Sequence, residues 1–169
     1  MTTNTHPYLQ WYNGGLALAR SILRCNQAAQ DILQTAFTKT LTGSRLPTDE
    51  AAQRVWFFKV IRNACIDSLR FQQRFQAEES AELFATTIDE IDPIEQSERQ
   101  QWVRQALLQL TSEQREILVL RDVNELSYAD IAQVLQLNSG TVMSRLHRAR
   151  LAMREQLLNL DRQSSLVQR

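Results

Sequence analysis

The chain has 169 residues, of which 43% are hydrophobic and 22% charged, with four glycines and three prolines. So few turn-forming residues exclude a turn-rich all-β fold, and the length and helix-forming composition predict an all-α protein of one or two small domains. Nineteen basic residues balance nineteen acidic ones. Zero net charge excludes a uniformly basic nucleic-acid-binding protein, but it says nothing about separated patches.

Several classes of protein are excluded by what the sequence lacks. No apolar run approaches the ~18 residues that a membrane span needs, and the first residues are too polar for a secretory signal. Two lone cysteines and two scattered histidines predict neither a disulfide framework nor a metal site. No Gly-rich phosphate loop and no nucleophile–base pair is found. We therefore expect a cytoplasmic protein without cofactor, catalytic residues or small-molecule substrate.

In chain order, apolar residues at helical spacing first predict three helices, over 9–24, 27–41 and 49–73. A loop with Gly and Pro over 42–48 separates the last two. These helices form an expected first domain, residues 1–75. An acidic stretch that Pro93 closes follows as a flexible linker over 76–93, with a short helical piece near 81–85.

The second expected domain covers residues 94–169, and its helix boundaries are marked by capping residues. A helix to Leu110 is followed by Thr111-Ser-Glu-Gln114, which has the capping-box form. The next helix breaks at 124–126. Ser127 and Ser139 are then the expected caps of a short helix over 128–136 and a long one to Leu160, and the tail after it is expected to fray.

The charges are strongly segregated along the chain. Residues 54–75 hold five basic residues and one acidic residue, residues 76–98 hold eight acidic residues and no basic one, and residues 139–154 hold four arginines and no acid. Arginine's planar guanidinium suits phosphate and guanine contacts. Two basic surfaces separated by an acidic segment are also what two solvated helix faces and a linker would give.

The last two helices have the pattern of a helix-turn-helix, whose second helix enters the major groove of DNA. Val142, Leu146, Ala149 and Met153 fall on one face, which we expect to pack on the domain. The opposite face carries residues suited to phosphates and base edges: Thr141, Ser144, Arg145 and Arg148. A helical hairpin with a solvated arginine face is the alternative.

The stretch from Ala106 to the last helix resembles region 4 of bacterial RNA polymerase sigma factors, in the extracytoplasmic function (ECF) group of the sigma-70 family. The motifs LSYADIA at 126–132 and GTVMSRLHRAR at 140–150 carry the resemblance. It implies binding to the −35 promoter element and to the flap of the polymerase β subunit. The implied −35 contacts are Ser139, Thr141, Ser144, Arg145 and Arg148. Met143 stands where the family often has arginine, which predicts a different sequence preference.

In the N-terminal half, residues 54–70 interleave basic residues with Trp56, Phe57 and Phe58. Aromatic side chains beside cations suit unstacked single-stranded bases. A role in the hydrophobic core is the alternative, and we expect it for Phe57 and Phe58.

This half resembles sigma region 2. Residues 31–37 (DILQTAF) are similar to the helix that grips the clamp of the polymerase β′ subunit, which implies polymerase contacts by Asp31, Leu33, Gln34 and Phe37. Residues 54–69 are similar to the −10 recognition and melting segment. The implied −10 contacts are Trp56, Lys59, Arg62, Asn63, Asp67 and Arg70. Gln53 stands where an aromatic residue is common, and Thr35 where an acidic one is.

Together the two resemblances imply an ECF sigma factor that binds core RNA polymerase, recognises both promoter elements and directs transcription initiation, with an anti-sigma factor as a further partner. Three other readings remain open. They are a stand-alone helix-turn-helix transcriptional regulator, an enzyme, and a sigma-like protein that sequesters a partner. We also expect the free chain to bind promoter DNA weakly, because each domain offers few phosphate contacts and the acids repel DNA.

Overall fold

The computed structural model describes residues 7–43, 46–78 and 98–167, and these ranges are helical with short turns and no strand. The all-α prediction is confirmed. None of the described helices is long and apolar enough to cross a membrane. The elements in chain order are η1 (Pro7–Trp11), α1 (Tyr12–Leu23), α2 (Asn26–Thr42), α3 (Glu50–Glu78), α4 (Glu98–Gln109), α5 (Ser112–Leu118), η2 (Val119–Val123), α6 (Tyr128–Leu135) and α7 (Ser139–Val167).

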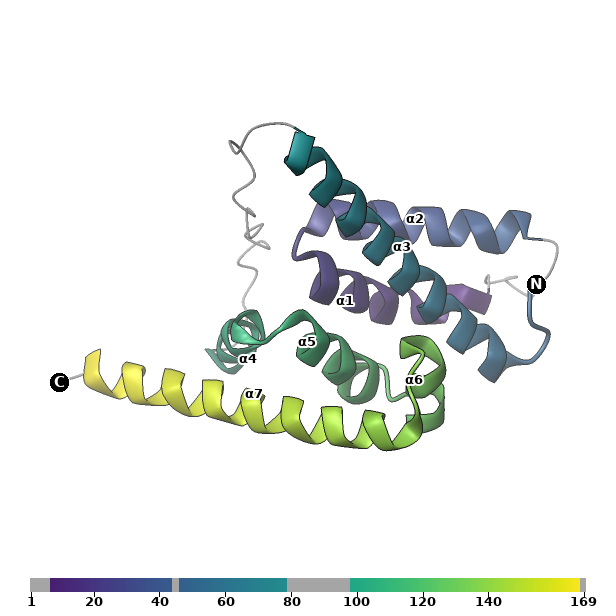
Figure 1. Ribbon diagram of the computed structural model, residues 1–169. Helices are drawn as coiled ribbons and strands as arrows, with labels where there is room; N and C mark the ends of the chain where they lie inside the picture. Colours follow the sequence, from purple (N-terminus) through teal and green to yellow (C-terminus); the bar gives the residue numbers. More distant parts are fainter. Residues whose placement is uncertain (1–6, 44–45, 79–97, 168–169) are drawn as a thin grey trace, which may run out of the picture.

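The N-terminal unit consists of η1, α1, α2 and α3, which pack against one another (Figure 1). Aromatic side chains fill the core between them. Phe57 is fully buried, and its ring lies 5.6 Å from that of Tyr8 and 6.1 Å from that of Trp11. Gly15 lets α1 approach α3, because a Cβ there would lie 2.7 Å from Ile61. The expected core role of Phe57 and Phe58 is confirmed, since both are 0% exposed.

The C-terminal unit consists of α4, α5, η2, α6 and α7, with α7 as the long helix at its base (Figure 1). Val142, Leu146 and Ala149 of α7 are buried, as the helical periodicity predicts, and Met153 is partly buried against the core. Element η2 is a π-helix inserted between α5 and the break at Asn124. Such insertions often mark functional positions.

The predicted capping residues are correct at two helices and wrong at the third. Thr111 and Gln114 form a complete capping box at α5, and Ser127 accepts from the backbone N–H of Asp130 at α6. At α7 the cap is Asn138, whose side-chain oxygen accepts from the backbone N–H of Thr141 at 2.8 Å. The prediction of Ser139 is wrong because Asn138, equally suited to the role, precedes it by one residue.

Two helices are longer than the sequence predicts. Helix α3 continues past Gln73 to Glu78, and α7 continues through the tail that was expected to fray, as far as Val167. Residues 79–97 lie outside the described part of the chain, and with them most of the predicted acidic linker and its short helix. The domain boundaries at 75 and 93 therefore stay a prediction.

The two units are in contact with each other. Helix α1 packs against α5 and η2, and α3 packs against α6. In Figure 1 the N-terminal helices lie above α5 and α6, with α7 below them. Two modules that bind separate DNA elements would have no need of such an interface, so its contacts bear directly on function.

Candidate nucleic-acid interface

Helices α6 and α7 form the predicted helix-turn-helix. The turn between them begins at Gln136, which has φ 57°, and the backbone N–H of Leu137 donates to the carbonyl of Ala132 at 2.9 Å. These contacts end α6 and redirect the chain within three residues. The Asn138 cap then starts α7, so the first turn of α7 lies at the exposed end of the unit, where its free N–H groups suit a phosphate.

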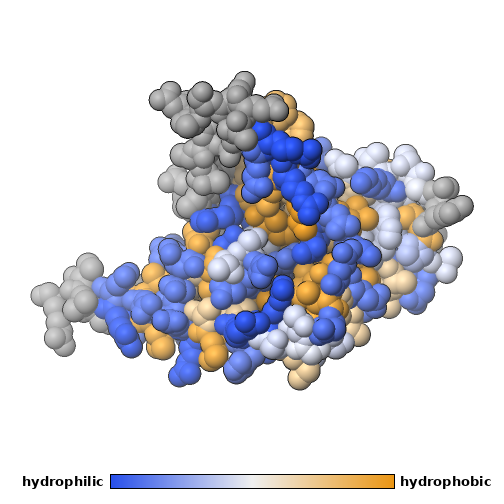
Figure 2. Space-filling view, in the orientation of Figure 1, coloured by the Kyte–Doolittle hydropathy of each residue, from blue (hydrophilic) through white to orange (hydrophobic). Residues whose placement is uncertain are grey.

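The predicted DNA-contacting residues of α7 lie on one face, because residues 141, 144, 145 and 148 are three, four and seven positions apart. Ser139, Ser144 and Arg148 are exposed, and Thr141 is half-buried against the cap. The Arg145 side chain is 35% exposed and lies 3.5 Å from the Glu113 carboxylate, a surface pair of little strength. In Figure 2, hydrophilic residues alternate with hydrophobic ones along α7.

Contacts on the neighbouring side of α7 hold this helix in place. Arg150 pairs with Asp122 of η2 at 2.5 Å, and the Arg121 guanidinium lies 5.2 Å above the ring of Tyr128 in α6. These interactions tie α6, η2 and α7 together. The arginines that face solvent, Arg145 and Arg148, are thus presented by a helix whose position is determined by other side chains.

The predicted −10 residues of α3 form a stripe along the helix. Asn63, Asp67 and Arg70 are exposed, and Asp67 lies 3.9 Å from Arg70. Lys59 is half-buried. Trp56 is also half-buried, and its ring lies edge-on to Tyr8 at 5.9 Å, so it contributes to the core as well as to the surface.

Arg62 is not free in this arrangement. Its Nε donates to the Glu116 carboxylate of α5, and the two side chains are only 20% and 9% exposed. Burial raises the pKa of Glu116, and the nearby Arg62 offsets this only in part. Burial, followed by the Glu116 charge, raises the pKa of the Cys65 thiol to about 12. The Arg62–Glu116 ion pair thus lies at a desolvated contact between α3 and α5.

Of the four predicted polymerase contacts on α2, two are exposed, one is half-buried and one is buried. Asp31 and Gln34 are exposed, whereas Phe37 is half-buried between Tyr12 and Phe57. Leu33 is 0% exposed and belongs to the core of this structure, so its contact with a partner stays a prediction that this surface does not support. The helical stripe that buries Ala29 and Ala36 also passes through Leu33.

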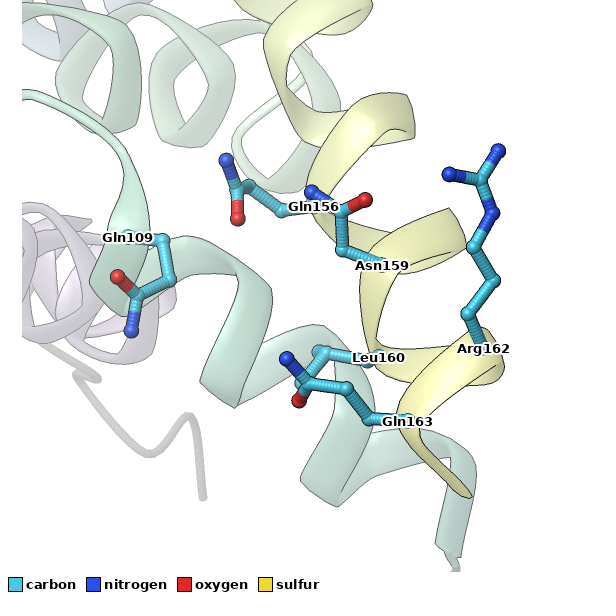
Figure 3. Close-up of a pocket in the computed structure, with 6 residues that line it drawn as sticks. All are labelled: Gln109, Gln156, Asn159, Leu160, Arg162 and Gln163. Carbon is cyan, nitrogen blue, oxygen red and sulfur yellow. The ribbon is translucent and has the colours of Figure 1, made fainter. Parts of the chain in front are cut away.

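The hollow shown in Figure 3 lies between α4 and the C-terminal half of α7 and contains none of the predicted site residues. Gln156 and Gln163 extend from α7 toward α4, and Arg162 points away. Among the described residues no three His, Cys, Asp or Glu side chains are grouped so as to hold a metal ion. The candidate sites are therefore the helix faces and no enclosed cavity.

Both units match models of known protein families. Residues 8–75 match the family model of sigma-70 region 2, and residues 100–153 match that of sigma-70 region 4. The RNA polymerase sigma-H factor of Pseudomonas aeruginosa is 32% identical over 149 residues, covering 82% of this chain and 77% of that protein. The chain belongs to the sigma-70 family of RNA polymerase sigma factors.

Within the sigma-70 family the chain falls in the ECF group. The ECF RNA polymerase sigma factor SigM of Mycobacterium tuberculosis is 36% identical over 133 residues, which are 79% of this chain and 66% of that protein. Among solved structures, the sigma factor RpoE of Bartonella quintana, in complex with the anti-sigma factor NepR, has a TM-score of 0.65 at 26% identity, covering 91% of this chain and 95% of that one.

The sequence analysis missed the residues that join regions 2 and 4. Arg54 donates to the backbone carbonyl of Asn124, and Arg115 donates through Nε to the carbonyl of Ser21 at 2.8 Å. The partners lie 70 and 94 positions apart in sequence. No local pattern reports such pairs. Arg115 is 6% exposed although it lies on α5, a helix of mostly polar residues, so the sequence carries no signal of its burial.

Proposed function

We propose that this sigma-70 family member is a promoter-specificity subunit that binds core RNA polymerase and positions it at promoters with −10 and −35 elements. It acts by binding, with no reaction and no cofactor of its own, and it acts in the cytoplasm, where the polymerase is. The observation that carries the proposal is the presence of regions 2 and 4 in this order on one chain.

The exposed face of α7 is proposed to read the −35 element. Arg145 and Arg148 have the reach for guanine edges and phosphates, while Ser139, Thr141 and Ser144 supply hydroxyl contacts. This assignment is supported by the capped N-terminus of α7 and by the exposure of Arg148. Met143, which is 58% exposed beside these residues, adds an apolar contact where a thymine methyl could be read.

Helix α3 is proposed to contact the −10 element with its exposed polar stripe. Asn63, Asp67 and Arg70 are available for this, and Trp56 and Lys59 border it. Arg62 joins them only when its pair with Glu116 is broken. On α2, Asp31, Gln34 and the exposed edge of Phe37 are the proposed contacts with the polymerase β′ clamp.

The remaining partner is an anti-sigma factor, proposed from the Bartonella quintana sigma factor whose structure includes one. Region 4 is also proposed to bind the β flap. In this structure regions 2 and 4 are packed together, so each of these partners first meets the chain in that arrangement.

The test is run-off transcription from a promoter library with core polymerase and the purified chain. We expect transcripts only when the chain is present, and we expect Arg145→Ala/Arg148→Ala to lose selectivity for the upstream element. Arg162→Ala, on the same helix outside the helix-turn-helix, is the matched control. A chain that fails to co-purify with core polymerase and that binds a palindrome as a dimer would instead be a stand-alone regulator.

A further inference from the structure

Near its C-terminal end, helix α3 is exposed on every side. Residues 70–75 are six consecutive exposed positions, and at 3.6 residues per turn they cover more than one full circumference of the helix. In the view of Figure 1 this end of α3 extends past α2. Phe71 and Phe75 lie here with 58% and 51% of their surface exposed, and neither is among the residues that pack against the core.

The two phenylalanine rings are in contact with each other. Their centroids lie 4.6 Å apart, and their planes are inclined at 52°. A pair four positions apart on a helix adds little to the stability of that helix, so helix formation alone does not account for two adjacent rings in water. Adjacent exposed apolar side chains, unlike scattered ones, indicate an interaction surface.

The charges beside the rings are positive. Arg70 and Arg74 are also four positions apart, so a row of two arginines runs next to the row of two phenylalanines. Arg70 has a surface pair of little strength with Asp67 at 3.9 Å, and Arg74 donates through Nε to the carbonyl of Arg70 at 3.4 Å. Residues 70–75 contain no acid. This surface therefore complements a ligand that carries both aromatic faces and negative charge.

Single-stranded nucleic acid is the ligand with that chemistry, because its bases stack on aromatic rings while its phosphates pair with cations. In a duplex the base faces are already covered by neighbouring bases. A base inserted between Phe71 and Phe75 would need about twice the ~3.4 Å spacing of stacked bases, and the rings are only 4.6 Å apart. The outer faces of the ring pair are thus the surfaces on which a base can stack.

The ring pair continues the proposed −10 stripe of α3. Asn63, Asp67, Phe71 and Phe75 follow one another at intervals of four, so they lie along one side of the helix. Twelve positions of helix measure ~18 Å, which is about the length of five stacked nucleotides. One DNA strand can therefore contact the polar stripe and the rings at the same time.

We propose that Phe71 and Phe75, flanked by Arg70 and Arg74, form a stacking platform for unpaired bases of an opened promoter strand. This rests on the proposed function, because it takes the strand to be promoter DNA. The platform accepts any base, since every base has a π-face, so it supplies affinity for the open strand without reading its sequence. That affinity offsets part of the cost of unstacking the bases.

Titration of the purified full-length chain into fluorescent oligothymidylate, followed by anisotropy, tests the platform. We expect Phe71→Ala/Phe75→Ala to weaken binding by about 5-fold to 150-fold for each stacked base, with an unchanged salt dependence. An abasic strand of equal length keeps the phosphates and lacks the bases, so it should bind the wild type and this variant equally. Val103→Ala/Leu158→Ala, which trims side chains 44% and 45% exposed on α4 and α7, is the matched control and should bind oligothymidylate like the wild type.

Further variants separate stacking from plain hydrophobic contact and from charge. Phe71→Tyr/Phe75→Tyr keeps the rings and should bind like the wild type, whereas Phe71→Leu/Phe75→Leu keeps apolar surface and should lose as much affinity as the alanine pair. Arg70→Ala/Arg74→Ala should lower the log–log salt slope by up to about 1.4, for two lost phosphate contacts on a single strand. Circular dichroism reports whether each variant is folded.

A wild type that ignores oligothymidylate, or an alanine pair that binds it equally well, would overturn the platform. So would an equal loss on the abasic strand, or a leucine pair with wild-type affinity, which would indicate a docking surface for protein. Run-off transcription with core polymerase from a template with a mismatched bubble tests the proposed function separately. If the binding differences appear while the wild type supports no transcription, the proposed function fails and the platform stands.

Discussion

Regions 2 and 4 present their proposed DNA-contacting residues in different ways. On α7 Arg148 is exposed, and Arg145 makes only a surface pair with Glu113 at 3.5 Å. On α3 one arginine of the stripe, Arg62, is held between the two units. Arginines on the two helices thus differ in whether DNA can reach them. A basic stripe in a sequence shows which residues can bind DNA, and packing decides when they can.

The largest expected effect of a single substitution is on the stability of the region 2 core. Phe57→Ala should lower the free energy of unfolding by about 3–5 kcal/mol, because a buried ring that contacts four other aromatic rings is lost. Urea unfolding measures the loss. Phe71→Ala, at a residue 58% exposed on the same helix, should change it by less than about 0.5 kcal/mol. Equal losses would show that Phe57 is not the centre of this core.

The next effect separates the exposed arginines from the covered one. Arg148→Ala should lower the salt dependence of duplex DNA binding by the free chain, by about 0.9 in the log–log slope for one lost phosphate contact. Arg62→Ala should leave that slope unchanged, because Glu116 already holds the guanidinium. Fluorescence anisotropy at several salt concentrations measures both slopes. A drop for Arg62→Ala as large as that for Arg148→Ala would contradict the covered position of Arg62.

The start of α7 gives a smaller effect. Asn138→Ala should destabilise region 4 by about 1 kcal/mol, because its side chain caps the helix. Ser139→Ala, at the neighbouring residue that the sequence favoured, should cost much less. Thermal unfolding of the two variants compares them directly. If Ser139→Ala lowered the stability of region 4 more than Asn138→Ala does, Ser139 would be the N-cap residue of α7.

The smallest effect concerns pH. The pKa of Glu116 is raised in the folded protein, so the folded state holds this proton more tightly than the unfolded state does. Its contribution to stability is therefore complete below the unfolded pKa and is lost as pH rises through the folded pKa. Between the unfolded-state and folded-state pKa of Glu116, the free energy of unfolding of the wild type should fall relative to that of Glu116→Gln. Above the folded-state pKa the two stability curves should run parallel.

Urea unfolding of both proteins at a series of pH values from 4 to 8, ~25 °C, measures that difference. Glu155→Gln removes the same charge from an exposed position of α7 and should give curves parallel to the wild type throughout. A wild type that gains stability over Glu116→Gln as pH rises would mean that Arg62 outweighs the burial of the carboxylate.

Much of this protein was predictable from its sequence, because much of it depends on local interactions. Helical periodicity placed the buried face of α7 at Val142, Leu146 and Ala149. The capping box at Thr111 and the cap at Ser127 follow from side chains three residues from their partners. The two motifs at 126–132 and 140–150 were sufficient to indicate the family.

Predictions that required a surface or a partner were less secure. Leu33 was expected on the polymerase-contacting face but lies in the core. The sequence did not show this, because the packing of α2 against the other helices determines which of its sides is covered. Asn138 and Ser139 are both suitable N-cap residues, and only the backbone geometry shows that the N–H of Thr141 donates to Asn138. Arg62 was expected to be available and is paired with a residue 54 positions away.

The sequence by itself determined the helices, the order of regions 2 and 4, and the residue types on each exposed face, since these follow from periodicity and composition over short stretches. Only the tertiary structure decided which arginines are covered and why Gly14 is a glycine. Its carbonyl meets an amide 110 positions away, and no local pattern encodes that separation. The physical reason is that contacts between units depend on the placement of whole helices, which the residues within each helix do not specify.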